Sequence, residues 1–260
     1  MSALFSCQDL SIAVAGRTLV QDLSFTVSPG ELLAVLGRNG TGKTLTMHTL
    51  AGLRAAAGGQ VLLRGTDVAA ARRQQTARHL ALLPQHVDDI FPATVIDTVM
   101  IGRHPHIGRF QWESASDHAI GRAALAAVGL DALARRDVLT LSGGERRRLA
   151  IAQILAQQPD VYLLDEPTNH LDPQHQLDAL RLFREKADEG ATVIASLHDV
   201  NLAVRYANRC LLLFGDGRWE LGPVDEILEE ARLSTLYATA MEAVPWRGTS
   251  LFIASADEAS

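Results

Sequence analysis

Residues 32–44 read LLAVLGRNGTGKT, and this stretch decides the fold of the chain. Its first five residues form a continuous apolar run, which favours a fully buried strand. Residues 37–44 then fit the pattern G-x-x-x-x-G-K-[ST] of a phosphate-binding loop, and a helix can begin near Lys43. A strand, a glycine-rich loop and a helix in this order are the context that such a loop requires. We therefore predict a nucleoside triphosphate site here, in preference to a glycine-rich turn with an incidental lysine.

The residues of this loop have complementary uses toward a triphosphate. Their backbone N–H groups can surround the α- and β-phosphates, because glycines let the backbone approach closely. The positive end of the following helix points at the anion. Lys43 can reach the β- and γ-phosphates, and the Thr44 hydroxyl can ligate Mg²⁺. The predicted binding residues are Gly37, Arg38, Asn39, Gly40, Thr41, Gly42, Lys43 and Thr44.

Two further strands are predicted to end in side chains with catalytic chemistry. The apolar residues 161–164 lead to Asp165 and Glu166, and residues 192–197 lead to His198. Strands that alternate with helices form a parallel sheet whose sites lie at the carboxyl ends of its strands, so these side chains should converge with the phosphate-binding loop. Asp165 can hold Mg²⁺ through water, with a turn or helix cap as its alternative role. Glu166 is the candidate general base for an attacking water.

The remaining chain divides into segments of different pattern. The first thirty residues read as short strands separated by turns. Residues from about 86 to 159 follow helical spacing and predict a mostly helical insertion. Asp172 and Pro173 favour a helix start, with Asp172 as N-cap and proline at the first position. Residues 211–221 read as a hairpin around a glycine-containing turn.

The bulk composition limits the classes of protein. With 260 residues, of which 47% are apolar, the chain can bury a sizeable core, and a net charge of −6 argues against general nucleic-acid binding. Cys7 and Cys210 provide neither a disulfide framework nor metal-ligand spacing, so we expect two buried thiols. No stretch approaches the ~18 apolar residues of a membrane span, and the start MSALFSCQDL lacks the basic region of a signal peptide. We expect a cytosolic chain whose membrane role comes through a partner.

Residues 141–145 read LSGGE and carry a second anion-binding pattern. Ser142, Gly143 and Gly144 precede a helix and can form a nest of backbone N–H groups. One triphosphate does not need two such nests in one chain. Together with the phosphate-binding loop, this signature string resembles the ATP-binding cassette (ABC) family, the ATPases that drive membrane transporters. The resemblance implies a head-to-tail pair of copies, in which each ATP lies between the loop of one copy and the signature of the other.

The resemblance covers nearly the whole chain and implies further roles for its motifs. Gln85, in the string LPQ, would reach Mg²⁺ and the attacking water, and His198, in SLHD, would be the switch histidine. Residues 169–172, NHLD, look like the loop that meets the opposite copy. By resemblance the catalytic residues are Glu166, His198, Gln85 and Lys43, the metal residues are Thr44, Gln85 and Asp165, and the binding residues include Ser142, Gly143, Gly144, Glu145 and Asp172.

The implied fold is α/β. It has a P-loop NTPase core with a mostly parallel sheet, an N-terminal antiparallel β region and an inserted helical subdomain. The core would comprise residues 1–86 and 160–260, with a tail from about residue 223. Residues 87–159 would form the helical subdomain that carries the signature.

Within the family, residues 94–106 and 197–207 look like those of importers of iron siderophores, haem and cobalamin. The implied partners are a second copy of the chain, an integral-membrane permease dimer and, indirectly, a substrate-binding protein, with no nucleic acid. The chain would be peripheral, on the cytoplasmic face of the inner membrane. Residues 85–92 and the helical insertion would dock on the permease, and His104 and His106 are interpreted as part of that surface, not as metal ligands.

The sequence departs from the family pattern at one place, and some of its features allow other interpretations. Where the family usually stacks an aromatic residue on adenine, residues 12–16 read IAVAG, so we expect only apolar contact from Ile12 or Val14. Residues 146–148, three arginines, are interpreted as a solvated helix face in preference to a nucleotide contact. The alternative functions are a soluble ABC ATPase, of the iron–sulfur assembly or translation factor type, and a non-hydrolysing ATP-dependent dimerisation module. Glu166 and His198 argue against the last.

Overall fold

A mostly parallel sheet forms the centre of the molecule. The computed structural model describes residues 4–86, 92–108 and 111–255. The strand order in this sheet is β10-β9-β3-β8-β7-β6, and each pair is parallel except β9 with β10. The predicted α/β fold with a mostly parallel sheet is therefore confirmed. The strands are β3 (Leu32–Leu36), β6 (Leu80–Leu83), β7 (Val161–Asp165), β8 (Thr192–Ser196), β9 (Arg209–Leu213) and β10 (Trp219–Pro223).

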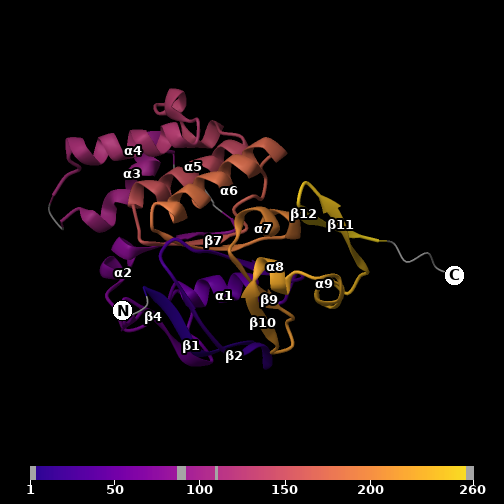
Figure 1. Cartoon of the computed structure of the whole chain (residues 1–260). Coiled ribbons are helices and arrows are strands. Elements are labelled where there is room, and N and C mark those ends of the chain that lie inside the picture. Colours follow the sequence, from indigo (N-terminus) through magenta and orange to yellow (C-terminus); the bar gives the residue numbers. More distant parts are fainter. Residues whose placement is uncertain (1–3, 87–91, 109–110, 256–260) are drawn as a thin grey trace.

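The continuous apolar runs in the sequence arise because the central strands are covered on both faces. Every residue of β3, β7 and β8 is buried. Side chains alternate across a strand, so Leu32 and Leu36 of β3 enter one core while Leu33 and Val35 enter the other. Helices cover the first face, and one helix and an antiparallel sheet cover the second (Figure 1). The helices on the first face are α5 (Gly143–Gln157), α6 (Pro173–Asp188) and α7 (Val200–Tyr206), and the helix on the second is α1 (Lys43–Leu50).

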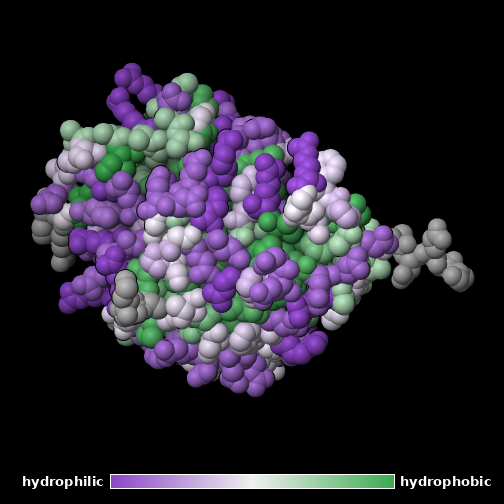
Figure 2. Space-filling model, in the orientation of Figure 1, coloured by the Kyte–Doolittle hydropathy of each residue, from purple (hydrophilic) through white to green (hydrophobic). Residues whose placement is uncertain are grey.

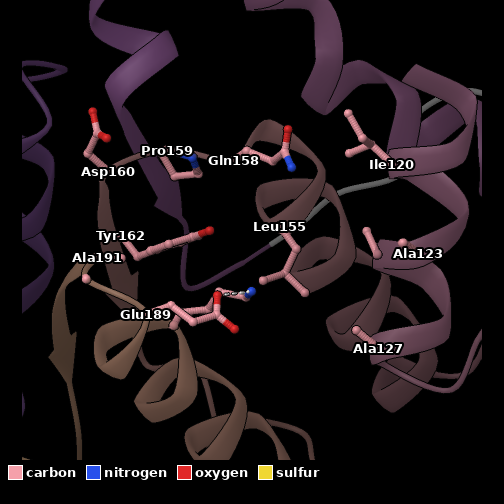
Figure 3. Close-up of a pocket in the computed structure, with 13 residues that line it drawn as sticks. Ile120, Ala123, Ala127, Leu155, Gln158, Pro159, Asp160, Tyr162, Glu189 and Ala191 are labelled. Atoms are coloured by element: carbon pink, nitrogen blue, oxygen red, sulfur yellow. Dashed lines mark hydrogen bonds and ion pairs between the residues drawn. The ribbon is translucent and has the colours of Figure 1, made fainter. Parts of the chain in front are cut away.

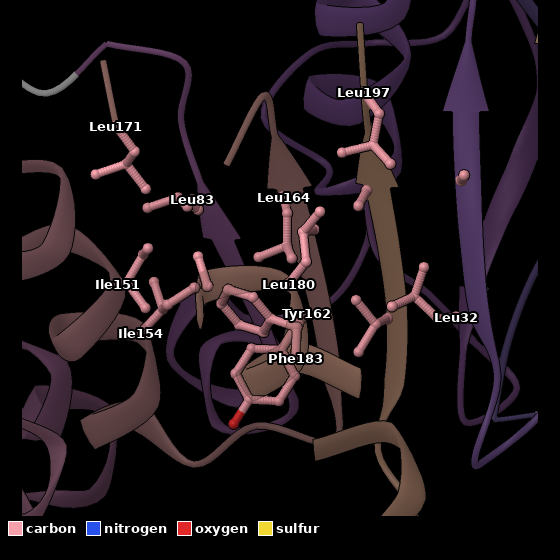
Figure 4. Packing of buried hydrophobic residues seen from close by; sticks show 14 of the residues in the cluster. Leu32, Leu83, Ile151, Ile154, Tyr162, Leu164, Leu171, Leu180, Phe183 and Leu197 are labelled. Carbon is pink, nitrogen blue, oxygen red and sulfur yellow. The ribbon is translucent and has the colours of Figure 1, made fainter. Parts of the chain in front are cut away.

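The first core is built around one aromatic pair. The ring of Tyr162 on β7 meets the ring of Phe183 on α6 edge to face, with 5.6 Å between centroids. Leu164, Leu180 and Ile154 pack around this pair (Figure 4). Helix α6 (Pro173–Asp188) begins where the sequence predicted, because the Asp172 carboxylate accepts the backbone N–H of the residue three positions further on.

The N-terminal part forms a four-stranded antiparallel sheet, as predicted. Its first two strands are long, whereas the sequence suggested short ones. The polar residues Asp9 and Asp22 interrupt the apolar alternation, but both adopt positive φ and the pairing continues past a register shift at this point. The sheet order is β2-β1-β4-β5, with β1 (Phe5–Val14), β2 (Arg17–Val27), β4 (Gly58–Leu63) and β5 (Thr66–Asp67).

Helices occupy the range in which the sequence predicted a helical insertion. Helices α3 and α4 pack against α5 on one side of the molecule (Figure 1). Helix α5 ends at Gln157 because Pro159 cannot continue it. The elements of this part are α3 (Val95–Met100), η1 (Ile101–His106), α4 (Ala115–Ala127), η2 (Asp131–Leu133), η3 (Val138–Thr140) and α5 (Gly143–Gln157).

The C-terminal part packs on helix α7. Asn201 of α7 exchanges two hydrogen bonds with the backbone of Phe252, at 2.8 and 3.1 Å, and this fixes the β11–β12 hairpin. The predicted hairpin of residues 211–221 is confirmed as β9 and β10. The remaining elements are α1 (Lys43–Leu50), α2 (Arg73–His79), α7 (Val200–Tyr206), α8 (Val224–Ile227), α9 (Glu230–Tyr237), β11 (Met241–Trp246) and β12 (Thr249–Ala254).

The surface shown in Figure 2 is mostly hydrophilic, with hydrophobic residues between the polar ones. Within the described residues, no helix combines the length and the apolar character that crossing a membrane would need.

Cys7 and Cys210 are free and buried, as predicted, and burial raises the pKa of each thiol to about 12. Both thiols therefore stay protonated at neutral pH and act as small apolar side chains.

Candidate nucleotide and catalytic site

The register of three central strands brings the predicted site residues to one edge. Val35 of β3 lies opposite Ser196 of β8, and Ser196 lies opposite Asp165 of β7. The three strands are parallel and end at the same level, so the phosphate-binding loop, the acidic pair and His198 follow them on the same side. The convergence predicted from the sequence is confirmed.

The phosphate-binding loop is shaped by close backbone contacts. A Cβ at Gly37 would lie 2.6 Å from the Leu213 carbonyl oxygen and 2.6 Å from the Thr41 hydroxyl, so no side chain fits there. Gly42 caps helix α1 with a φ of 103°, a left-handed conformation that favours glycine. The loop therefore presents its backbone N–H groups at the start of α1, where an anion is stabilised.

Lys43 is folded back onto this loop. Its Nζ donates to the carbonyl of Gly37 at 2.8 Å and to that of Arg38 at 3.2 Å, and the residue is 5% exposed. Burial lowers the lysine pKa, while the charges of Glu166 and Asp165 act in the opposite direction. The ammonium group thus lies inside the loop, where it can exchange these carbonyls for phosphate oxygens.

A cavity of about 440 Å³ joins the loop to the catalytic candidates. Gln85 and Glu166 line it together with Lys43 and Thr44, so one space holds the candidate residues for phosphate binding and for water activation. The other lining residues are Val14, Arg17, Leu19, Asn39, Gly40, Gly42 and Leu45. A different cavity, of about 460 Å³, lies between α4 and the start of β7, where Ile120, Ala123 and Ala127 face Leu155 (Figure 3). It contains no phosphate-binding loop.

The Glu166 carboxylate contacts three polar side chains. Gln85 Nε2 donates to Oε2 at 2.7 Å, and Asn169 Nδ2 donates to the same oxygen. His198 Nε2 lies 2.5 Å from Oε1. Glu166 itself adopts a φ of 50°, an uncommon conformation for a non-glycine residue and one often found at functional sites. The sequence predicted Gln85 and His198 near Glu166, but it did not predict Asn169.

The two carboxylate oxygens of Asp165 differ in their surroundings. Ser196 Oγ donates to Oδ1 at 2.7 Å and accepts the backbone N–H of Glu166 at 2.9 Å. Oδ2 is buried and finds no hydrogen-bond partner among the described residues. A buried carboxylate oxygen is rarely left unpaired, so a ligand for it is expected. Oxygen donors from Asp165 and Thr44 are those that a hard divalent cation prefers.

The signature residues lie outside the cavity that holds the loop. Ser142 caps α5: its Oγ accepts the Glu145 N–H at 3.2 Å, and the Glu145 carboxylate accepts the Ser142 N–H at 2.7 Å. A Cβ at Gly143 would meet nothing within 4 Å. Asp172 is the N-cap of α6, as predicted. The structure therefore does not bring Ser142, Gly144 or Asp172 to the nucleotide loop of the same chain.

The three arginines after the signature differ from the prediction. Arg147 is buried, with 4% exposure, so its assignment to a solvated helix face was wrong. Arg148 donates to the Val128 carbonyl at 2.9 Å, and Arg146 donates to the Leu139 carbonyl at 3.0 Å. Helical spacing could have found this, because Arg147 shares the buried face of α5 with Ile151. Burial lowers the Arg147 pKa to about 10, against the opposing charges of Asp165 and Glu166, so the side chain stays charged at neutral pH.

Of the two residues expected to contact adenine, Ile12 and Val14, only Val14 lines the cavity. Ile12 is fully buried in the second core, so it cannot contact a base. Val14 is 43% exposed and lines the cavity, as does Arg17, whose Nη2 donates to the Gly215 carbonyl at 2.7 Å. A guanidinium can stack on a planar ring, so Arg17 is a second candidate for base contact that the sequence did not suggest.

Comparison with known proteins identifies the family. The model of the ABC transporter family matches residues 20–169, more than half of the chain. A hemin import ATP-binding protein of Deinococcus radiodurans is 46% identical over 79% of this chain and 78% of its own length. An achromobactin transport ATP-binding protein of Dickeya dadantii is 38% identical over 94% and 91%. The chain therefore belongs to the ABC transporter family, whose ATP-binding subunits hydrolyse ATP.

The solved structures agree with this assignment. A chain from an inward-facing metal-chelate type ABC transporter superposes with a TM-score of 0.86 at 28% identity, over 98% of this chain and 99% of that one. The resemblance found in the signature and the phosphate-binding loop is thus confirmed. The confirmation covers the family, the fold and the ATPase activity.

The Glu166→Gln variant should bind ATP but lose most of its turnover. Glutamine preserves the size of the side chain and removes the base, and general-base catalysis contributes roughly 10²–10⁴-fold. Steady-state phosphate release and nucleotide binding measure the two properties separately. Glu229→Gln, an acid-to-amide change on the surface, should behave as the parent. Turnover of Glu166→Gln equal to that of the parent would remove Glu166 from the role of base.

The Val14→Tyr variant should bind nucleotide up to about tenfold more tightly. A stacked aromatic ring adds ~1–3 kcal/mol in nucleic-acid sites, and ~1.4 kcal/mol corresponds to a factor of ten. The parent should discriminate weakly between ATP and GTP, because phosphate contacts are common to both. Val244→Tyr, at a similarly exposed valine on β11, is the matched control. A strong preference of the parent for ATP, or no gain from Val14→Tyr, would show that other groups recognise the base.

Proposed function

We propose that this chain is the ATP-hydrolysing motor subunit of a membrane importer for a metal chelate, such as an iron siderophore or haem, or for cobalamin. The names of the relatives support this, since they transport hemin and achromobactin. A third relative, from Halobacterium salinarum, is a cobalamin import ATP-binding protein at 40% identity. The observation that carries the ATPase role is the single cavity that combines the phosphate-binding loop with Gln85 and Glu166.

In the proposed reaction the loop and Lys43 hold the triphosphate. Mg²⁺ would be held by Thr44, Gln85 and Asp165, and when bound it would supply positive charge to the phosphate oxygens. Glu166 accepts the proton of the water that attacks the γ-phosphorus, while the bond to the β-phosphate oxygen breaks. His198, already 2.5 Å from Glu166, orients this carboxylate and can donate to the γ-phosphate. Gln85 must give up its bond to Glu166 before it can contact Mg²⁺ or the water.

The second half of the site would come from another copy of the chain. Ser142, Gly143 and Gly144 do not line the cavity that holds their own loop, and the space beside Gly143 is open. In a head-to-tail homodimer these N–H groups would contact the γ-phosphate held by the partner. Asp172 and Glu145 would lie at the same interface. Two copies would thus enclose two ATP molecules.

The coupling to a permease dimer would use the helical subdomain. We propose the division into a core of residues 1–86 and 160–260 and a helical subdomain of residues 87–159. Residues 85–92 would link the nucleotide site to the permease, although Val87 and Asp89 lie outside the described residues. The chain would sit peripherally on the cytoplasmic face of the inner membrane, and a substrate-binding protein would deliver cargo from the other side.

Mg·ATP should convert the Glu166→Gln variant into a homodimer. Blocked hydrolysis preserves the sandwiched nucleotide, and Ser142→Arg should prevent association because it adds bulk and charge to the nest. Light scattering with and without ATP gives the mass directly. Arg181→Ala, which removes an exposed charge on α6, is the control and should still dimerise. A Glu166→Gln variant that stays monomeric at saturating ATP with its permease present contradicts the shared site.

Transport itself tests the importer assignment. When the chain is reconstituted with its permease in vesicles, ATP turnover should rise as a loaded substrate-binding protein is added, with haem, a ferric siderophore or cobalamin as the cargo tested.

Cysteines introduced at Val87 or Asp89 should cross-link to a permease loop. Cross-links confined to soluble proteins would favour the soluble ABC ATPase. Absence of ATP hydrolysis under all these conditions would favour the dimerisation module.

A further inference from the structure

The guanidinium of Arg147 uses all of its donor groups on backbone carbonyls. An arginine side chain has five N–H donors in a planar fork. Here Nη1 and Nη2 each contact two consecutive carbonyls, and Nε contacts one. Nη1 donates to the segment before the helical insertion. Nη2 and Nε donate to the end of β7 and the turn that follows it. The acceptors are Pro84 at 2.6 Å and Gln85 at 3.4 Å from Nη1, Asp165 at 2.8 Å and Glu166 at 2.6 Å from Nη2, and Pro167 at 3.3 Å from Nε.

These contacts link Gln85 and Glu166, two of the catalytic candidates, to the same side chain. The backbones of Gln85 and Glu166 are joined through Arg147, and their side chains are joined directly by a hydrogen bond of 2.7 Å. The position of the guanidinium therefore sets the distance between the amide of Gln85 and the carboxylate of Glu166. Arg147 lies on α5, the helix that begins at the signature residues, so a shift of this helix moves all five contacts together.

We propose that Arg147 is a positioning residue that links the signature helix α5 to the placement of Gln85 and Glu166 for ATP hydrolysis. The inference rests on the proposed function, in which the start of α5 contacts the partner's nucleotide. A displacement of α5 would then reach the catalytic carboxylate of its own chain through one side chain. Arg148, the next residue on the helix, donates to Val128 and has no such link to the acidic turn.

The fork geometry, and not the positive charge alone, carries this role. Five carbonyls from two segments require donors that point in several fixed directions. A lysine keeps the charge, but its three donors radiate from one atom and cannot match the fork. A glutamine keeps two donors and no charge. The Lys and Gln variants therefore separate the effect of shape from the effect of charge.

Arg147→Gln and Arg147→Lys should both lower ATP turnover by about tenfold to a hundredfold, because a displacement of about 1 Å at a catalytic group can cost on the order of 100-fold. The affinity for ATP should stay within about twofold of the parent, since the phosphate-binding loop is untouched and a factor of two is a small fraction of a kcal/mol. Arg148→Gln, the matched control, should keep the parent's turnover and affinity. Thermal unfolding identifies the folded variants, and Arg147→Lys alone suffices if the Gln variant does not fold. Parent-level turnover in a folded Arg147→Lys variant would overturn the proposal.

A double-mutant cycle with Gln85→Ala tests whether Arg147 affects ATP turnover through Gln85. If Arg147 acts by placing Gln85 against Glu166, its removal should cost less in the Gln85→Ala background than in the parent. Equal costs in both backgrounds would reject the link. A parent that hydrolyses ATP while both Arg147 variants keep full turnover refutes this inference and leaves the proposed function intact. A parent without ATPase activity, even with its permease, refutes the proposed function instead.

Discussion

The hydrogen-bonded register of β3, β8 and β7 is the constraint on which the site depends. These strands are buried on both faces, so their backbone groups must pair with one another, and pairing fixes Val35, Ser196 and Asp165 at one level. Shifting one strand by a residue would exchange the side chains that enter the two cores. The cores therefore hold the register, and the register places the phosphate-binding loop, the acidic pair and His198 together.

Around this edge the structure leaves several groups in unusual states. Asp165 Oδ2 is buried with no hydrogen-bond partner in the part of the chain that the structure describes, Lys43 donates to carbonyls of its own loop, and Glu166 adopts positive φ. Unpaired buried polar atoms and uncommon backbone conformations cost stability, so proteins tend to keep them only at functional sites. Each of these three groups faces a position where ATP and its metal would bind. Among the described residues, one other buried side-chain polar atom lacks a hydrogen-bond partner, the hydroxyl of Tyr237 on α9, a residue that does not line the cavity at this edge.

The chain carries two anion-binding patterns, and the described residues do not bring them together within one copy. The loop, Gln85 and Glu166 line one cavity, whereas Gly143 faces open space. What joins the two patterns inside the chain is α5, which carries the signature at its start and Arg147 about one turn further on. Under the proposed function, this arrangement would let the helix link the interface between two copies to the candidate base Glu166.

The sequence by itself determined the features that depend on neighbouring residues. The phosphate-binding loop, the strand that precedes it, the cap of α6 at Asp172 and the carboxylates at the end of β7 are readable because each motif is contiguous. Tertiary structure decided the contacts between distant segments: Arg147 reaches Pro84 across 63 positions and Asp165 across 18. It also decided that Ile12 is buried while Val14 faces the cavity. Helical spacing can indicate that Arg147 is buried, but backbone carbonyls carry no residue identity, so the five that its guanidinium binds can be named only from the folded chain.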